Sequence, residues 1–183
     1  MNREPAGGSH VGHDNMSTII DSGTWTAAAA VLALVCRVQA RLFALPLGQV
    51  VETMRPLPVE RIAGAPHFMP GLAVIRGAPV PVVDAARLLG AAGGDARRFV
   101  TVLAGSRCVA LAVGSVLGVR ALAAGSLHEL PPLLQEAGAD VVAAIGLLDA
   151  ELLLVLQGTR LLPEDVWGGL DLPALRDGAG APA

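Results

Sequence analysis

The segment GLAVIRGAPVPVVDAARLLG, residues 71–90, places one arginine, Arg76, inside an otherwise apolar run. An unpaired charge in apolar surroundings is strongly unfavourable, so this side chain must be exposed, paired, or both. Three interpretations are open: a strand end that points to water, a structural ion pair, or a group that binds another molecule. The planar guanidinium carries five donors, which suits it to reading carboxylates or backbone carbonyls of a partner.

Residue types found in catalytic and metal sites occur elsewhere, but not in a complete arrangement. His10, His13 and Asp14 have a ligand-like spacing, yet their Gly- and Ser-rich surroundings offer no second half-site and favour a solvated tail. Ser126 and His128 are near neighbours with no third group to orient them, which disfavours a hydrolase. The sequence therefore predicts no catalytic residue, no cofactor and no metal, and the chain is not expected to be an enzyme.

Two other patterns favour structural roles. The glycine-rich stretch GAAGGDARR, residues 90–98, lacks the Lys-Ser/Thr of a phosphate loop and is interpreted as a linker. Cys36 and Cys108 lie in apolar segments and belong to no CxxC motif. Two small buried hydrophobes in a reducing compartment are favoured over a disulfide or redox pair.

Composition limits the kind of protein this can be. Of 183 residues, 53% are apolar and 16% charged, which is typical of a chain with a buried core. A net charge of −3 and an aromatic content of 3% argue against a nucleic-acid partner. The apolar run AAAAVLALVC, residues 27–36, is shorter than the roughly 18 residues of a membrane helix. We therefore expect a soluble, cytoplasmic protein.

Punctuation by glycine and proline divides the chain into a tail, one domain and a second tail. Residues 1–26 and 171–183 lack apolar periodicity and are predicted to be flexible, whereas residues 27–170 form the domain. Short apolar runs separated by turn residues predict an all-β fold of one or two small barrels. The expected strands cover residues 31–38, 42–47, 50–56, 72–77, 79–84, 98–104, 107–113, 115–122, 140–148 and 151–157.

Turn and cap signals connect these strands. Hairpin turns are expected at Gly77–Ala78, Gly105–Ser106 and Asp149–Ala150. Asp84 is expected to cap a brief helix that Gly90 ends. A closing helix is predicted over residues 159–170, restarting at Pro163.

Two strands carry further information in their alternation. In residues 107–113, large and small apolar side chains alternate, so both faces of this strand are expected to be covered. Pro79 and Pro81 are two residues apart, so their missing N–H groups lie on the same side of the strand. That side cannot donate hydrogen bonds, which predicts an edge strand or a barrel rim beside Arg76.

Three segments together resemble the CheW-type chemotaxis coupling proteins. They are FALPLGQVVETMRP (43–56), IAGAPHFMPGLAVIRGAPVPVVDAARLLG (62–90) and AAIGLLDAELLLVL (143–156), and the likeness extends over about residues 30–165. The resemblance implies two SH3-like β-barrels over a shared core and no catalytic activity. It implies a bridge between the cytoplasmic tip of chemoreceptors and the regulatory domain of a CheA-type histidine kinase, a domain similar to these proteins.

The same resemblance implies roles for individual residues. Arg76 matches the arginine of the receptor-coupling region, and Glu52 matches the neighbouring glutamate. The matching framework consists of Gly71, Gly77, Pro81 and Asp84. Departures from the family pattern, such as Val74 and Gly114, leave two alternatives open: a scaffold in surface motility or gene regulation, and a scaffold that binds the kinase but no receptor.

We expect Glu52 and Arg76 to meet across the first barrel in a partly exposed ion pair. Such a pair contributes little to stability, so its main role would be to hold the guanidinium in one pose. The expected partner-binding residues are Arg76, Glu52, Val51, Met54, Ile75 and Gly77. Met54, Met69, Leu72 and Ile75 either line an adaptable apolar groove for a receptor helix or belong to the core.

Overall fold

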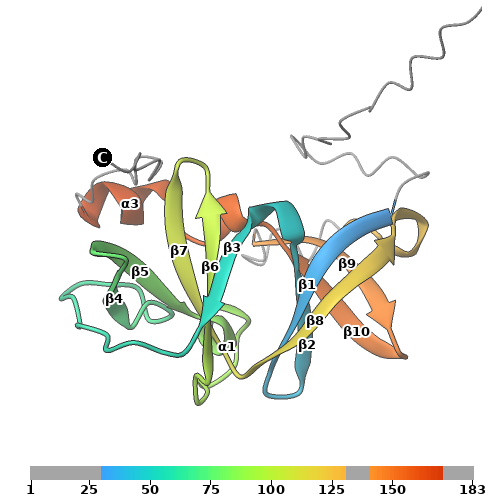
Figure 1. The fold of residues 1–183 in the computed structure, drawn as a ribbon, viewed down its shortest axis with the longest axis horizontal. Helices are drawn as coiled ribbons and strands as arrows, with labels where there is room; N and C mark the ends of the chain where they lie inside the picture. The colour runs from blue at the N-terminus through green and yellow to red at the C-terminus, as the bar shows by residue number, and fades with distance from the viewer. Residues whose placement is uncertain (1–29, 131–140, 171–183) are drawn as a thin grey trace, which may run out of the picture.

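The computed structural model describes residues 30–130 and 141–170, in which two five-stranded sheets lie side by side (Figure 1). The A barrel consists, in spatial order, of β8 (Ser115–Ala123), β1 (Ala30–Val38), β2 (Arg41–Pro46), β10 (Glu151–Leu156) and β9 (Val142–Leu148). The B barrel consists of β3 (Val50–Met54), β6 (Arg98–Ala104), β7 (Arg107–Val113), β5 (Ala78–Asp84) and β4 (Gly71–Ile75). The helical segments are η1 (Leu47–Gln49), α1 (Ala85–Leu88), η2 (Ala124–Ser126), η3 (Gly158–Arg160) and α3 (Glu164–Leu170).

The all-β prediction is confirmed, but the barrels are not successive halves of the chain. The five strands of the B barrel are consecutive and are inserted between β2 and β8 of the A barrel. The pair formed by Glu52 and Arg76 therefore belongs to the inserted barrel, not to the barrel that begins first. Local apolar patterns define strands without specifying which distant strands pair, which is why the sequence did not predict this insertion.

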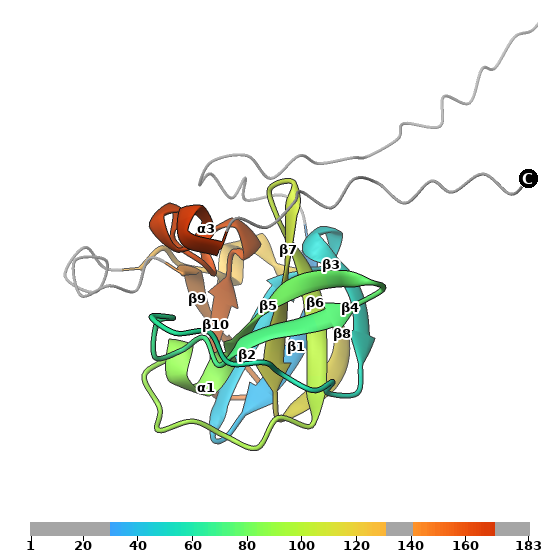
Figure 2. The ribbon, with the colours of Figure 1, turned by 90° about the vertical axis from the view of Figure 1, so that its left-hand side faces the viewer.

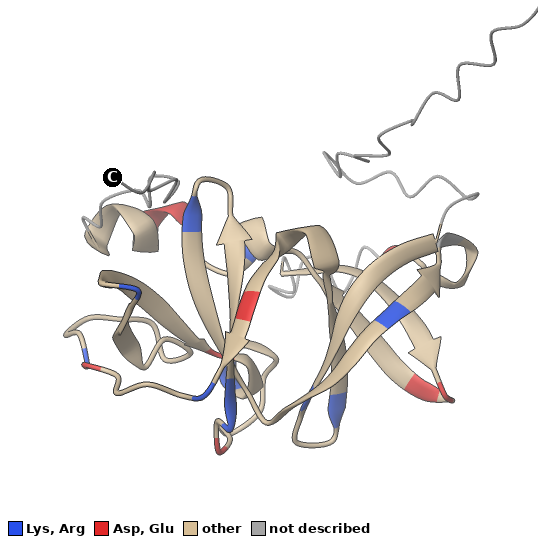
Figure 3. Cartoon of the chain, in the orientation of Figure 1, with Lys and Arg blue, Asp and Glu red and all other residues tan. Residues whose placement is uncertain are grey.

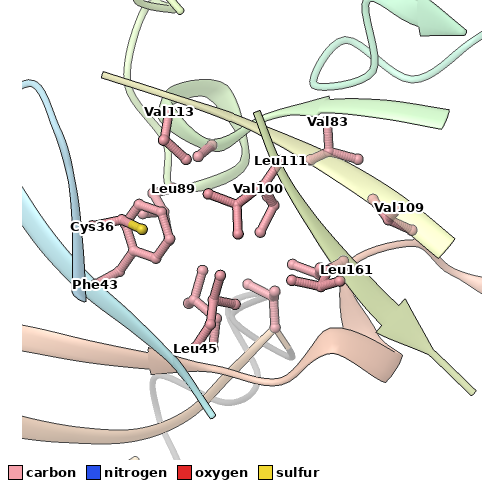
Figure 4. Close-up of a cluster of buried hydrophobic side chains, with 14 of the residues drawn as sticks. Cys36, Phe43, Leu45, Val83, Leu89, Val100, Val109, Leu111, Val113 and Leu161 are labelled. Carbon is pink, nitrogen blue, oxygen red and sulfur yellow. The ribbon is translucent and has the colours of Figure 1, made fainter. Parts of the chain in front are cut away.

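Strand alternation divides the buried side chains into three cores. In β1, Ala33 and Val35 face the interior of the A barrel, whereas Leu34 and Cys36 face the layer between the barrels. In β7, Ala110 and Ala112 pack inside the B barrel while Val109, Leu111 and Val113 pack into the layer between them, so the prediction of two covered faces is confirmed. Figure 4 shows this shared layer, in which Phe43 and Leu45 of one barrel meet Val100 and Leu111 of the other.

The two barrels repeat one architecture with their strands circularly permuted. Strands β8-β9-β10-β1-β2 of the A barrel correspond in order and direction to β3-β4-β5-β6-β7 of the B barrel. Both barrels contain one parallel pair, with Val155 opposite Ala44 in one and Val82 opposite Ala110 in the other. Both also have a β-bulge in the first strand of this series, between Val116 and Gly118 in β8 and between Val50 and Glu52 in β3.

For the proline-containing strand, the edge placement, one of its two predicted placements, is wrong. β5 is an interior strand, between β4 and β7, and not an edge. Its pairing with β7 begins only at Val82, however, so the stretch with Pro79 and Pro81 is paired on the β4 side alone. The missing N–H groups therefore shorten the parallel ladder instead of placing the whole strand at an edge.

Most local signals are reproduced in the structure. Asp84 accepts hydrogen bonds from the backbone N–H groups of Ala86 and Arg87 at the start of α1. The hairpin turns at Gly105–Ser106 and Asp149–Ala150 are present, but the β4–β5 turn is Arg76–Gly77, one residue earlier than predicted. The predicted closing helix is divided into η3 and α3 around Pro163.

Polar contacts join the barrels in addition to the shared core. At the β1–β2 tip, Gln39 donates to the Gly93 carbonyl at 2.5 Å and Arg41 donates to the Leu89 carbonyl. Between the barrels, the Gly158 N–H donates to the Gln49 side chain at 2.8 Å. Within residues 30–130 and 141–170, no helix combines the length and hydrophobicity needed to span a bilayer.

Candidate partner-binding site

Arg76 and Glu52 form a two-pronged ion pair, here called the B fork. Arg76 Nε donates to Glu52 Oε1 and Arg76 Nη2 to Oε2, each at 2.7 Å. The exposed fraction of the side chain is 77% for the arginine and 24% for the glutamate. The expected ion pair is therefore present, and the arginine is its accessible half.

The backbone places these two side chains at opposite edges of the curled B sheet. Glu52 lies on edge strand β3, directly after the bulge, and Arg76 lies in the turn that follows the other edge strand, β4. Arg76 and Gly77 have φ angles of 51° and 80°, as a tight hairpin turn with two left-handed residues requires. Figure 2 shows the tip of the β4–β5 hairpin reaching toward β3, so the B fork closes the seam of the barrel.

The electrostatics keep both members of the B fork charged. The hydrogen bond from Arg76, reinforced by its charge, lowers the pKa of Glu52. The same bond raises the pKa of Arg76. A bidentate contact fixes the plane of the guanidinium while leaving its other edge free for a second acceptor, which is the arrangement needed to read a carboxylate or carbonyl.

The thiols near the core are unsuited to nucleophilic chemistry. Burial raises the pKa of Cys36 to about 12. The pKa of Cys108 is also raised, first by burial and second by the charge of Glu52. Both cysteines are free thiols, and because reactivity requires the thiolate, they act as small core residues.

Thr101 lies next to the B fork and was not singled out from the sequence. It is 3% exposed, stands directly opposite Glu52 on the neighbouring strand β6, and faces the interior of the B barrel. Its hydroxyl oxygen has no hydrogen-bond partner. No signal in the sequence could have identified it, because a threonine inside the strand RFVTVLA is ordinary for β structure.

The other predicted partner-binding residues divide into exposed and buried ones. Val51, the bulged residue of β3, and Gly77 are exposed, whereas Met54 packs against the B-barrel core. Ile75 and Met69 are buried in two different cores. For these last two the structure favours the core interpretation over an open groove, so any part they play in binding is indirect.

The predicted framework residues hold the hairpin that carries Arg76. Gly71 has a φ of 151°, and a Cβ there would lie 1.9 Å from the Glu60 carbonyl oxygen, so no larger residue fits. Pro81 is buried opposite Leu72. The backbone N–H of Asp84 donates to the Phe68 carbonyl at 2.8 Å, which ties the end of β5 to the preceding loop.

A second two-pronged pair, the A fork, was not predicted. Arg37 of β1 donates to both carboxylate oxygens of Glu151 of β10, at 2.9 and 3.0 Å. The pair spans β2 at the end of the A barrel near the β1–β2 turn, and it lowers the pKa of Glu151. The two residues are 114 positions apart, so only the fold brings them together.

Exposed apolar side chains mark three surfaces. On the B barrel, Val74 of β4 lies opposite Pro79 of β5 on the outward face of the hairpin. On the A barrel, Leu147 of β9 lies opposite Leu152 of β10 in the equivalent place. The third surface is the outer side of β1 and β8, where the exposed residues are Leu32, Leu117 and Val119.

Charge is sparse around these surfaces. Strand β3 carries one charged residue, Glu52, and strand β8 carries one, Arg120, and Figure 3 shows these strands mostly in tan. Contacts on such faces therefore depend on apolar area, with a few charges fixing orientation.

The described part of the chain was also searched for groups that could bind a metal or act in catalysis. Residues 30–130 and 141–170 contain no cluster of His, Cys, Asp and Glu able to hold a metal ion. The Ser126 hydroxyl donates to the Ala123 carbonyl at 2.8 Å, and with His128 it borders a shallow hollow beside Leu147 and Leu152. His10, His13 and Asp14 lie outside the described residues.

Comparisons with known proteins agree with this geometry. A family model described as CheW-like domain matches residues 32–166. Among solved structures, the fold is similar to the crystal structure of the scaffolding protein TtCheW from Thermoanaerobacter tengcongensis, with a TM-score of 0.61 and 21% sequence identity. That alignment covers 69% of this chain and 88% of the other. The search of curated proteins gave no match.

Proposed function

This chain belongs to the CheW-like domain family, and from that premise we propose that it is a non-enzymatic adaptor coupling the cytoplasmic tips of chemoreceptors to a CheA-type histidine kinase. Its place in the cell would be the cytoplasmic side of membrane receptor arrays. The observation that carries the proposal is the B fork: an arginine held in one pose by Glu52, with 77% of its side chain exposed at a hairpin tip.

The B fork is assigned to the receptor. Receptor tips are helical, and a helix that docks on a protein surface needs an apolar stripe and a fixed polar contact. Figure 2 shows β3, the β4–β5 tip and β8 along one side of the molecule. The exposed Val51, Leu117 and Val119 supply apolar area on these strands, and Arg76 supplies the polar contact.

The kinase is assigned to the outward hairpin faces. The pairs Val74–Pro79 and Leu147–Leu152 occupy equivalent positions on the two barrels. Two equivalent apolar faces suit a partner that is itself built from such barrels, as the resemblance implies for the regulatory domain of the kinase. Each contact is small, and repetition across an array would supply the missing affinity through avidity.

Coupling in this scheme is an effect of binding energy. Receptor and kinase occupy different surfaces of one rigid pair of barrels, so the state of one partner can bias the other only through the shared complex. No bond is made or broken by the adaptor itself.

The test is co-purification of the full chain with its own cell's receptor tip and kinase regulatory domain, each tagged separately. We expect the wild type to bind both partners and the Arg76→Ala variant to lose binding of the receptor tip alone. Binding of the kinase alone by the wild type would favour the scaffold that no longer binds receptor. Binding of neither would overturn the proposal.

A further inference from the structure

Thr101 presents an arrangement that the fold itself does not require. A hydroxyl that is buried without a hydrogen-bond partner destabilises a protein, and an apolar residue of the same shape would fit the site better. The side chain lies on the interior face of the B barrel, in the same cross-strand row as Glu52. Directly opposed residues of this kind have Cβ atoms about 5 Å apart, so a carboxylate can reach the hydroxyl by a change of rotamer.

The A barrel provides an internal comparison. The register that places Thr101 opposite Glu52 in the B barrel places Val35 opposite Gly118 in the A barrel, one position after the same bulge. Val35 is buried in the same way and has no polar group to satisfy. The hydroxyl therefore occurs in the barrel whose edge strand carries the carboxylate, and a methyl group replaces it in the barrel that has none.

We propose that Thr101 is a positioning residue for the B fork: Glu52 holds Arg76 in one pose in the free protein, where the free edge of the guanidinium makes the first contact with the partner, and the Thr101 hydroxyl donates to the Glu52 carboxylate when Arg76 then leaves Glu52 to bind a carboxylate of the partner. The partner step rests on the proposed function, whereas the contact between Thr101 and Glu52 does not. In the free protein both Glu52 oxygens accept hydrogen bonds from Arg76, and the Thr101 hydroxyl has no hydrogen-bond partner.

The exchange of Arg76 for the Thr101 hydroxyl at Glu52 lowers the free-energy cost of separating the ion pair. The Glu52 side chain is 24% exposed, so solvent alone would compensate its charge only in part after removal of its counter-ion. A carboxylate has about four acceptor positions, and a buried hydroxyl beside it can fill one of them. Thr101 thus makes the release of Arg76 less unfavourable, at the expense of stability in the free state.

The first experiment needs no partner and uses the full chain with Arg76→Ala to imitate release. The pKa of the Glu52 carboxyl is followed by carbon-detected NMR in Arg76→Ala alone and combined with Thr101→Val or Thr101→Ser. Cys108, the other titratable group that the charge of Glu52 affects, has a raised pKa and titrates far from the acidic range. We expect an upward shift of the Glu52 pKa with valine and none with serine, because only serine keeps the donor. An unchanged pKa with valine would overturn the proposal.

The second experiment measures binding of an isolated receptor tip and thermal unfolding of the single variants. Thr101→Val is expected to keep or raise the melting temperature while weakening receptor binding about threefold to tenfold, and Thr101→Ser is expected to restore binding. A purely structural threonine would lower stability and binding together, and that outcome would overturn the proposed role. If the wild type binds no receptor tip while the NMR shift is present, the proposed receptor function fails and the contact between Thr101 and Glu52 is upheld.

Discussion

Val74 and Leu147 occupy equivalent positions in the two barrels and are the two most exposed large apolar side chains among the described residues, at 65% and 69%. Each follows from the same local arrangement: an outward-facing residue of an edge strand, paired across a tight hairpin with another exposed residue, Pro79 or Leu152. Solvent-facing leucine and valine on edge strands favour association, and their presence at equivalent positions of both barrels supports the proposal that these faces bind a partner.

This equivalence leads to a prediction about the kinase. Replacement of Leu147 or Val74 by serine is expected to weaken binding of the kinase regulatory domain about tenfold each. The reason is that serine removes apolar area that would be buried when the kinase docks. Calorimetric titration of each variant measures the change. The matched control is Leu32→Ser on the outer side of β1, which should leave kinase binding unaltered. Equal losses in all three variants would show that the hairpin faces are not the kinase site.

The B fork leads to a second prediction, in which stability and binding separate. Arg76→Ala removes an exposed pair, so the melting temperature is expected to change by no more than about 3 °C. Binding of the receptor tip is expected to fall at least about tenfold, because the guanidinium that Glu52 holds in one pose on that face is lost. Arg76→Lys keeps the charge but not the two-pronged geometry and should restore binding only in part. Full binding by the alanine variant would remove Arg76 from the receptor site.

The lowered pKa of Glu52 leads to a third prediction, with a definite sign. A carboxyl whose pKa is lower in the folded than in the unfolded protein adds stability above the unfolded value, about 4.3, and loses it as the pH falls through the folded value. The difference in unfolding free energy between the wild type and Glu52→Gln should therefore be constant from about pH 5 to 8 and shrink below about pH 4.

Urea unfolding across this pH range measures the difference, and Glu151→Gln should behave in the same way because Arg37 lowers the pKa of Glu151. High salt is expected to reduce both differences, since both pairs are partly exposed and ions can reach them. A difference that grows on acidification would contradict the assignment of either fork.

Local features of the fold could be predicted from the sequence, because they depend on neighbouring residues. The alternation in RCVALAV predicted two covered faces, and the cap at Asp84 followed from a carboxylate before AARLLG. The long-range features could not. The insertion of one barrel into the other, and the A fork between Arg37 and Glu151, depend on pairings that no local pattern specifies.

Only part of the candidate site could be predicted from the sequence. Arg76 was conspicuous because a charge interrupts an apolar run, and Glu52 followed from the family resemblance. Thr101 became visible only once the register placed it opposite Glu52 and its hydroxyl was found without a partner. The turn also shifted by one residue, since Arg76 itself adopts the left-handed conformation that glycine normally supplies at the first central position.

The hairpin that presents Arg76 depends on Gly71, and this gives a last prediction. A Cβ at this position would lie 1.9 Å from the Glu60 carbonyl oxygen, a backbone atom that takes part in the pairing of Glu60 with Leu72. Since neither the backbone nor its φ of 151° can adapt, Gly71→Ala is expected to destabilise the fold by at least about 2 kcal/mol and to release the β4 edge. The matched control is Gly48→Ala, where nothing lies within 4 Å of the added atom and little change is expected. Chemical denaturation measures the free energy of unfolding of both variants, and amide exchange at Leu72 reports on β4 itself. Similar stability in the two variants would show that the close approach of β4 to Glu60 does not hold the hairpin in place.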